Sequence, residues 1–185
     1  IKDSPETLTE EEVKRVKAYF TEPAYESLDD ATAEASLSSQ AQEHKAFSRW
    51  LERNTHPHRI PGYRTVTLSL KPTGVAPGDV TDSQLEAIAD LADQYSFSEI
   101  RATHNQNLVL ADVKKSDLFA LWQKAKVAGF ATPNIGTLTD LICCPGGDFC
   151  SLANAKSIPV AEAIQRRFDD LDYLYDLGDL TLNIS

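Results

Sequence analysis

The sequence predicts an α+β fold in which helices cover one face of an antiparallel sheet, followed by the beginning of an α/β unit. Residues 63–130 alternate β-branched segments with amphipathic segments in the order β-α-β-β-α, which is typical of such a sheet. Residues 131–185 then read as a strand, a helix and a strand, an order that makes the two strands parallel. The hydrophobic content of 42% and the charged content of 25% are those of an ordinary globular protein.

Composition also restricts the partners and the compartment. A net charge of −10 disfavours binding to phosphate backbones, so we expect no nucleic-acid partner. No apolar run approaches the ~20 residues of a membrane span, and Ile1–Ser4 do not begin a signal peptide, so we expect no membrane partner. Three cysteines without a secretory signal favour thiols kept in a reducing, cytoplasmic compartment. Because the sequence contains no methionine, we interpret it as an internal fragment of a longer protein.

Residues 1–56 are predicted to form a helical arm or linker. Thr9 and Glu12 have the spacing of a capping box, which would start a first helix, and Pro23 would end that helix. Residues 29–42 are rich in Ala, Ser and acidic side chains and contain few large apolar ones, which indicates a weak helix or a linker.

A short anchored helix and a loop are predicted to lead into the next unit. Phe47, Trp50 and Leu51 lie at positions i, i+3 and i+4, enough for one apolar helix face. The stretch His56–Gly62 contains two prolines and a glycine and is predicted to be a loop. Its His-x-His pair could bind a metal ion, but no third ligand is near it in the sequence, so an ordinary polar loop is favoured.

Residues 57–130 carry the predicted antiparallel sheet. The stretch Arg64–Leu70 alternates with period two and is rich in β-branched residues, which predicts a strand. Thr81 and Gln84 form a second capping box. The helix that follows is expected to bury one face, which comprises Leu85, Ile88, Ala89, Ala92 and Tyr95.

Two further strands and a helix complete this unit. The strands are predicted at 98–103 and 107–113, on either side of a His-Asn-Gln turn. The last helix is predicted to end at Gly129, because glycine suits the left-handed conformation that ends many helices. Its buried face comprises Leu118, Leu121, Trp122 and Ala125.

Residues 131–185 are predicted to open an α/β unit. A strand over 137–143 runs into the cysteines, and a second strand lies at 179–185. Between them, Ser157 is predicted to cap a helix that has Pro159 in its first turn. The buried face of this helix comprises Val160, Ala161, Ile164, Phe168 and Leu171. Since parallel strands end at the same edge of a sheet, both strands should lead to one site.

All three cysteines of the chain lie within residues 142–150, around a Pro-Gly-Gly turn. Cys143 and Cys144 are adjacent, so their side chains should project to opposite sides of an extended backbone. Cys144 and Cys150 are separated by a segment with two glycines, which lets the backbone approach a bulky group. Structural zinc sites usually have tighter cysteine pairs, and thioredoxin-type sites need Cys-x-x-Cys. The spacing therefore favours iron–sulfur ligands, with zinc and structural thiols as the alternatives.

Two segments of the chain resemble the sirohaem-dependent nitrite/sulfite reductases. One is Asn134–Ala153, which contains the cysteines, and the other is Arg101–Leu108, which has the family's pattern Arg-x-Thr-x-x-Gln-Asn. The resemblance covers most of the chain and implies an internal fragment of the C-terminal half of the parent. It implies a ferredoxin-like "parachute" unit at 57–130, followed at 131–185 by the N-terminal part of a sirohaem and iron–sulfur domain.

The resemblance also implies which cysteines are ligands. In the family a [4Fe–4S] cluster is held by Cys-x5-Cys and by a later Cys-x3-Cys. Cys144 and Cys150 match the first pair, whereas Cys143 matches no ligand position. The second pair is expected beyond Ser185, together with the rest of the site, so no catalytic residue is assigned within this chain.

Four residues match a segment that lies near the sirohaem in the family, namely Arg101, Asn105, Gln106 and Asn107. The guanidinium of Arg101 could pair bidentately with a sirohaem carboxylate. The alternative is that Arg101 is a sheet-edge residue with a local ion pair, and that the three amides stabilise a turn.

The parent that the resemblance implies reduces sulfite to sulfide, or nitrite to ammonia, by six electrons. Its cofactors are sirohaem and a [4Fe–4S] cluster, its substrate is a small anion, and its electron donor is a ferredoxin or a flavoprotein. The remaining halves of the same polypeptide complete the site, so the isolated fragment is expected to be inactive and to lack both cofactors. The alternative hypothesis is a non-catalytic or regulatory domain whose cysteines bind zinc or are structural.

Overall fold

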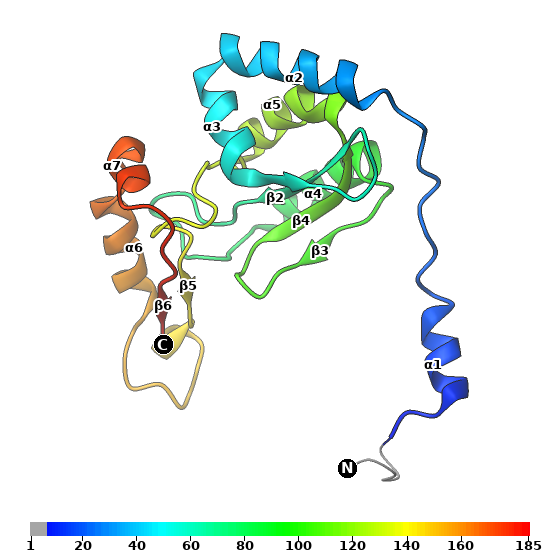
Figure 1. Cartoon of the computed structure of the whole chain (residues 1–185). Coiled ribbons are helices and arrows are strands. Elements are labelled where there is room, and N and C mark those ends of the chain that lie inside the picture. Colours follow the sequence, from blue (N-terminus) through cyan, green and yellow to red (C-terminus); the bar gives the residue numbers. More distant parts are fainter. Residues whose placement is uncertain (1–6) are drawn as a thin grey trace.

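The computed structural model describes residues 7–185 (Figure 1), so the stretch used to exclude a signal peptide lies outside the described residues. The larger of the two described sheets is antiparallel, with the strand order β1-β2-β4-β3. Its strands are β1 (Thr55–Pro57), β2 (Tyr63–Leu68), β3 (Arg101–Ala102) and β4 (Leu108–Lys114). The predicted α+β class is confirmed.

Four helices share one hydrophobic core with this sheet. They are α2 (Asp30–Glu43), α3 (Lys45–Asn54), α4 (Asp82–Tyr95) and α5 (Leu118–Ala128). Apolar residues of all four helices pack with β2 and β4, and the largest of them include Trp50, Phe47, Leu68, Ile88, Leu110, Leu118 and Leu121. In Figure 1 these helices lie above and behind the strands. A cavity of about 740 Å³ lies elsewhere on the sheet, between strand residues and the segment 19–25.

The start of α4 follows from its sequence, whereas its buried face is shifted. The Thr81 hydroxyl accepts from the Gln84 N–H at 3.2 Å and the Gln84 side chain accepts from the Thr81 N–H at 2.9 Å, which confirms the capping box. Leu85 and Ala89 are exposed, contrary to the prediction, and Leu91 is buried. Leu85 lies in the first turn, next to the solvated cap, so the buried stripe begins one turn later with Ile88, Leu91, Ala92 and Tyr95.

Leu118 provides a direct test of this core. It is fully buried at the start of α5, so Leu118→Ala is expected to lower the free energy of unfolding by about 2–5 kcal/mol through lost burial and a cavity. Val127→Ala on the same helix is the matched control, because Val127 is 91% exposed and should lose less than ~0.5 kcal/mol. The measurement is urea-induced unfolding of the chain, and a loss below ~1 kcal/mol for Leu118→Ala would contradict the core assignment.

The predicted end of α5 is confirmed, because Gly129 closes the helix with φ +89°. The predicted end of the first helix is wrong. α1 (Glu10–Lys17) begins after Thr9, whose hydroxyl accepts a hydrogen bond from the Glu12 N–H, but it stops well before Pro23. No residue of α1 is buried, so no packing prolongs this short helix.

Two other parts of the arm are more regular than their composition indicates. The Ala-rich segment is the helix α2, and Asp29 caps it by accepting hydrogen bonds from the N–H groups of Ala31 and Thr32. The predicted loop at 56–62 is wrong at its start, because Thr55–Pro57 pair with β2 as an edge strand. An edge position tolerates proline, which would break the hydrogen-bond ladder of a central strand.

The C-terminal unit contains a second, two-stranded sheet. β5 (Ile142–Cys143) and β6 (Asn183–Ile184) pair in parallel, which confirms the predicted relation of the two strands. Both strands are shorter than predicted. Residues 137–140 form turns and bends instead, because Thr137 donates from its hydroxyl and N–H to the Asn134 carbonyl and the Asp140 N–H donates to the Thr137 carbonyl.

The helical part between these strands is split into α6 (Ile158–Arg167) and α7 (Leu171–Asp176). The unit's core, Leu141, Cys143 and Ala161, is small and meets only one side of α6. Ala161 is therefore buried as predicted, whereas Val160 is half-exposed. Ser157 precedes α6 without making a side-chain cap hydrogen bond. Among the helices of residues 7–185, none is long and apolar enough to cross a membrane.

Candidate functional site

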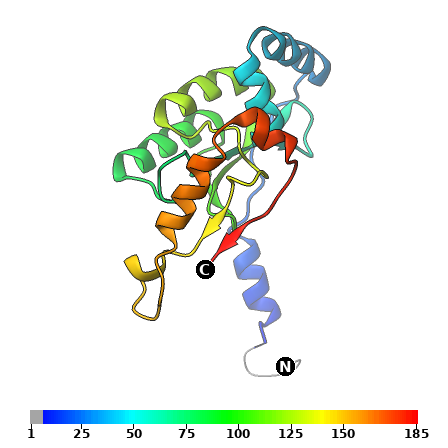
Figure 2. The ribbon, with the colours of Figure 1, turned by 90° about the vertical axis from the view of Figure 1, so that its left-hand side faces the viewer.

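The cysteine loop, residues 144–157, leaves the end of β5 and returns into α6 (Figure 2). Gly146 has φ +60°, and a Cβ there would lie 2.8 Å from the carbonyl oxygen of Ala155, so the turn requires glycine. The Gly147 N–H donates to the same carbonyl at 2.8 Å, and the Cys150 N–H donates to the Gly146 carbonyl at 2.9 Å. Backbone contacts therefore hold the Pro-Gly-Gly turn in shape.

The three thiols are all free, but they lie in two environments. Cys143 is 3% exposed and belongs to the core of the C-terminal unit, where its Sγ lies 3.2 Å from the Cys144 carbonyl. Burial raises the pKa of the Cys143 thiol, and the neighbouring Cys144 thiol raises it further. Cys144 and Cys150 are half-buried on the loop. The two thiols of the cysteine loop are thus partly accessible, whereas the Cys143 thiol of β5 is enclosed in the core.

Gln106, in the turn between β3 and β4, ties the larger sheet to the base of the cysteine loop. Its Nε2 donates to the Cys143 carbonyl at 2.9 Å, and its Oε1 accepts from the Cys143 N–H at 2.9 Å. Gln106 has φ +55°, a left-handed conformation that is uncommon for residues other than glycine, asparagine and aspartate.

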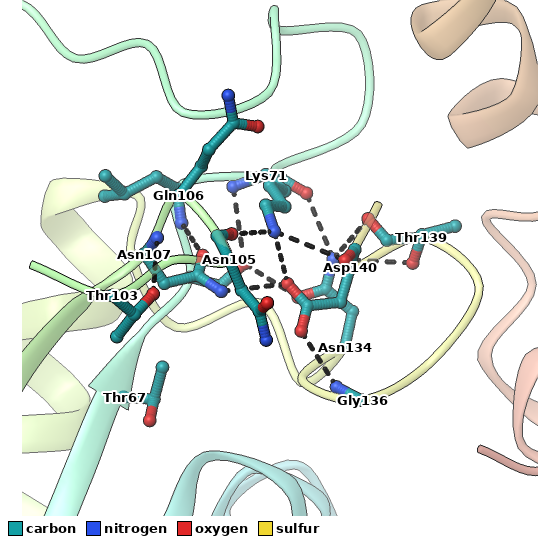
Figure 3. Close-up of polar contacts among 12 residues, drawn as sticks. Thr67, Lys71, Thr103, Asn105, Gln106, Asn107, Asn134, Gly136, Thr139 and Asp140 are labelled. Carbon is teal, nitrogen blue, oxygen red and sulfur yellow. Dashed lines mark hydrogen bonds and ion pairs between the residues drawn. The ribbon is translucent and has the colours of Figure 1, made fainter. Parts of the chain in front are cut away.

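A buried ion pair lies beside this contact (Figure 3). The side chains of Lys71 and Asp140 are 0% and 4% exposed, and their Nζ and Oδ1 atoms are 2.6 Å apart. Lys71 Nζ also donates to the backbone carbonyls of Asn105 and Asp140. Asp140 in turn accepts hydrogen bonds from Asn107 Nδ2 at 2.9 Å and from the Gly136 N–H at 3.0 Å.

Both charges of this pair are desolvated, so the pair depends on its complete set of hydrogen bonds. Burial lowers the pKa of Lys71, and the Asp140 carboxylate partly offsets that effect. Asn134 reinforces the junction, since its Nδ2 donates to the Lys71 carbonyl at 3.1 Å and its Oδ1 accepts from Ser69 Oγ at 2.7 Å. Together these contacts hold the segment before β5 against the segment that follows β2.

The structure separates the four residues that match the sirohaem segment. Arg101 has a side chain 58% exposed on the edge strand β3, pairs with Glu99 at 2.6 Å, and borders the cavity at the segment 19–25. Asn105 contributes its backbone carbonyl to Lys71. Of the four residues, only Gln106 and Asn107 reach the C-terminal unit by their side chains. Contacts of this kind are those of residues that stabilise the fold. That any of the four residues binds a cofactor stays a prediction.

Two of the predicted amides, Gln106 and Asn107, meet the C-terminal unit at this junction, at Cys143 and Asp140 rather than at the predicted ligands Cys144 and Cys150, and the ion pair beside them was not expected. Lys71 lies in a segment that reads as a turn, and Asp140 lies in one that reads as a strand. Nothing local marks either residue, because their contact spans 69 positions of the chain. The one available signal was that each charge lies within an otherwise apolar or turn-forming stretch.

The His-x-His pair does not gather a metal site. His58 uses both ring nitrogens, since Nε2 lies 3.0 Å from Asp112 Oδ1 and Nδ1 accepts from the Ile60 N–H at 2.9 Å. Across residues 7–185, no group of three or more His, Cys, Asp and Glu side chains is placed to hold a metal ion. Cys144 and Cys150 therefore have no further protein ligands of these types within the described chain.

Comparisons with known proteins identify relatives that share this architecture. Residues 56–128 match the nitrite/sulfite reductase ferredoxin-like half domain family. The solved structure of the NirA protein of Mycobacterium tuberculosis superposes with a TM-score of 0.56 and 25% identity, over 71% of this chain and 23% of that one. The ferredoxin-like half domain and its α+β architecture are thereby established.

Curated relatives point to the same enzymes. The chain is 30% identical over 136 residues to sulfite reductase (ferredoxin) 2 of Mycolicibacterium paratuberculosis, which covers 70% of this chain and 24% of that protein. It is 32% identical over 97 residues to nitrite reductase (NAD(P)H) of Bacillus subtilis, covering 51% and 12%. It is 30% identical over 117 residues to the chloroplastic ferredoxin–nitrite reductase of Betula pendula, covering 60% and 19%. The matches thus span about a quarter or less of each relative: residues 56–128 are the ferredoxin-like half domain of the nitrite and sulfite reductases, and the chain is similar to a fragment of those enzymes.

Proposed function

We propose that this chain is part of a sirohaem-dependent enzyme that reduces sulfite to sulfide, or nitrite to ammonia, by six electrons. Within it, Cys144 and Cys150 supply two ligands of a [4Fe–4S] cluster. The observation that carries the proposal is that the three thiols lie in two environments. Two are half-buried on a glycine-containing loop, and the third is buried in the core. The names of the relatives, which are sulfite and nitrite reductases, support the reaction class.

The two thiols suit such a cluster in chemistry, but they do not complete it. Iron–sulfur clusters are held by cysteine thiolates, and a [4Fe–4S] cluster takes four of them. The other two ligands are therefore proposed to come from outside the described chain. The Cys144 N–H donates to the Ile184 carbonyl at 2.8 Å, so the last residues of the chain lie beside the cysteine loop. The chemistry that the bound cofactors supply is the relay of single electrons and an iron centre for the anion.

The proposed partners follow from the relatives and from charge. The electron donor is proposed to be a ferredoxin or a flavoprotein, and names of the relatives include both ferredoxin and NAD(P)H. With a net charge of −10 the chain repels an acidic ferredoxin, so docking is proposed to take place on another part of the polypeptide. That remaining part is also proposed to supply most of the pocket for the small anion.

The chain is proposed to consist of three segments: an arm at 1–56, the half domain at 57–130, and the start of the cofactor domain at 131–185. Arg101 lies at the edge of the half domain with its guanidinium exposed and paired with the carboxylate of Glu99. An exposed guanidinium of this kind suits a bidentate contact with a sirohaem carboxylate.

The isolated chain of 185 residues is expected to be colourless and inactive, because two thiolates cannot close a four-ligand cluster. The measurement is the visible spectrum and the iron content after aerobic purification. A Soret-type band with stoichiometric iron would contradict the proposal that residues outside this chain complete the cofactor site. The full-length protein, prepared in the same way, is the control and should hold both cofactors; its failure to do so would contradict the proposed function itself.

A further inference from the structure

The strand β5 is hydrogen-bonded on both edges, although only one edge has a neighbouring strand. Toward β6, the N–H groups on either side of Cys143 donate to the carbonyls of Leu182 and Ile184 at 2.9 and 2.8 Å. On the other edge, no strand pairs with Cys143 among the described residues. There the side chain of Gln106 bonds both the N–H and the C=O of Cys143.

A primary amide is well suited to this pair of contacts. It carries a donor N–H and an acceptor C=O in one plane, as a peptide group does, so it can pair with both backbone groups of one residue as a strand would. An ionised glutamate offers acceptors only, and a lysine offers donors only. The contact therefore favours an amide side chain at position 106 over a charged one.

The backbone at position 106 would prefer another residue. Gln106 has φ +55°, and the left-handed region favours glycine and asparagine. Beside it, Gly78 has φ +86°, and a Cβ there would lie 3.1 Å from the Gln106 Cβ, so the glycine leaves room for the glutamine stem. A turn with only a backbone role would carry glycine at 106, so the glutamine indicates a requirement for its side chain.

From these contacts we infer that Gln106 is a positioning residue for the cysteine loop. Gln106 holds the Cys143 peptide from one side while β6 holds the chain from the other, and this fixes the point from which Cys144 leaves β5. The half domain contributes no thiol, yet through this amide it controls where the Cys144 sulfur lies. The clamp is a property of the cofactor-free chain, and its purpose as a ligand-positioning device rests on the proposed function.

The first test measures the clamp without any cofactor, by amide hydrogen exchange in the 185-residue chain. In Gln106→Gly the Cys143 N–H loses its acceptor, so its exchange is expected to accelerate ~10-fold relative to the Cys144 N–H, which keeps its partner in β6. Glycine also suits the left-handed backbone, so global unfolding should not account for the change. Gln106→Glu keeps an acceptor and should protect the Cys143 N–H better than glycine does.

His104→Ala is the matched control, because His104 is exposed in the same turn and lies outside the contact with Cys143. It should leave the exchange of the Cys143 N–H at the wild-type rate. Equal exchange of the Cys143 N–H in the wild type and in Gln106→Gly would overturn the inference.

The second test uses the full-length protein and measures iron content, the reduction potential of the cluster and its electron paramagnetic resonance spectrum. Gln106→Gly is expected to shift the potential and spectrum and to lower activity ~10–100-fold, as losses of outer-shell partners do, and Gln106→Asn to restore part of each. If Cys144→Ser keeps its iron, the proposed function fails. If Cys144→Ser loses iron while Gln106→Gly keeps the wild-type potential and spectrum, the proposed function stands and the positioning role is overturned.

Discussion

In the full-length protein, Cys144→Ser and Cys150→Ser are each expected to lose nearly all cluster iron, whereas Cys143→Ser keeps it. The serine hydroxyl is a poor substitute for a thiolate at iron, so the loss of one ligand leaves a labile or partial cluster. Cys143 is buried in the small core of the C-terminal unit, whereas Cys144 and Cys150 are half-buried on the cysteine loop. In Cys144→Ser and Cys150→Ser, the rate of anion reduction should fall by more than the ~10–100-fold that is typical when an outer-shell partner is lost. In Cys143→Ser, this rate should change little.

The measurements for the cysteine variants are iron content, the visible spectrum, and the rates of sulfite and nitrite reduction. Because Cys143→Ser places a hydroxyl in an apolar core, Cys143→Ala is the second variant at that position, and urea-induced unfolding separates lost folding from lost ligation. Loss of iron in a stably folded Cys143→Ala would contradict the ligand assignment. So would full iron and activity in Cys150→Ser.

Local causes explain which elements could be predicted from the sequence. The capping box of Thr81 and Gln84 acts within one helical turn, so its pattern was sufficient to place the start of α4. Gly129 likewise ends α5 through its own left-handed backbone. The parallel pairing of β5 and β6 was predictable because a strand-helix-strand connection leaves few topologies open.

Contacts between distant segments explain what could not be predicted. Thr55–Pro57 become a strand only because β2 lies beside them, and their own composition is that of a loop. At the candidate site, the spacing of the cysteines was informative, but the clamp by Gln106 spans 37 positions. A resemblance placed the amides near a cofactor, whereas in the structure the side chains of Gln106 and Asn107 join the larger sheet to the C-terminal unit. Positions of this kind become visible only when the tertiary contacts are known.

Asp140→Asn is expected to destabilise the folded chain by about 3–5 kcal/mol, because it leaves the buried Lys71 ammonium without a counter-charge. The double variant Lys71→Met and Asp140→Asn removes both charges and should recover a large part of that loss. Asp179→Asn is the control, since Asp179 is exposed and its ion pair with Arg53 contributes little. Urea-induced unfolding of the single and double variants gives the coupling between the two residues, and additive losses would contradict a dependence of Lys71 on Asp140.

The pH dependence of the same variants tests whether Lys71 is charged in the core. Burial lowers the pKa of Lys71 below its ordinary value of 10.5, and Asp140 opposes that shift, so the pKa should fall further in Asp140→Asn. Between the lowered pKa of the folded chain and the ordinary pKa of the unfolded chain, the unfolded chain binds more protons, so the free energy of unfolding rises with pH. The loss caused by Asp140→Asn should therefore shrink as the pH rises from the pKa of Lys71 in the folded variant to its higher pKa in the folded wild type, while the double variant, which has no lysine at position 71, should not show this gain. A loss that is independent of pH would mean that the lysine has escaped to solvent, and the junction would then not be the closed, desolvated network that fixes the cysteine loop.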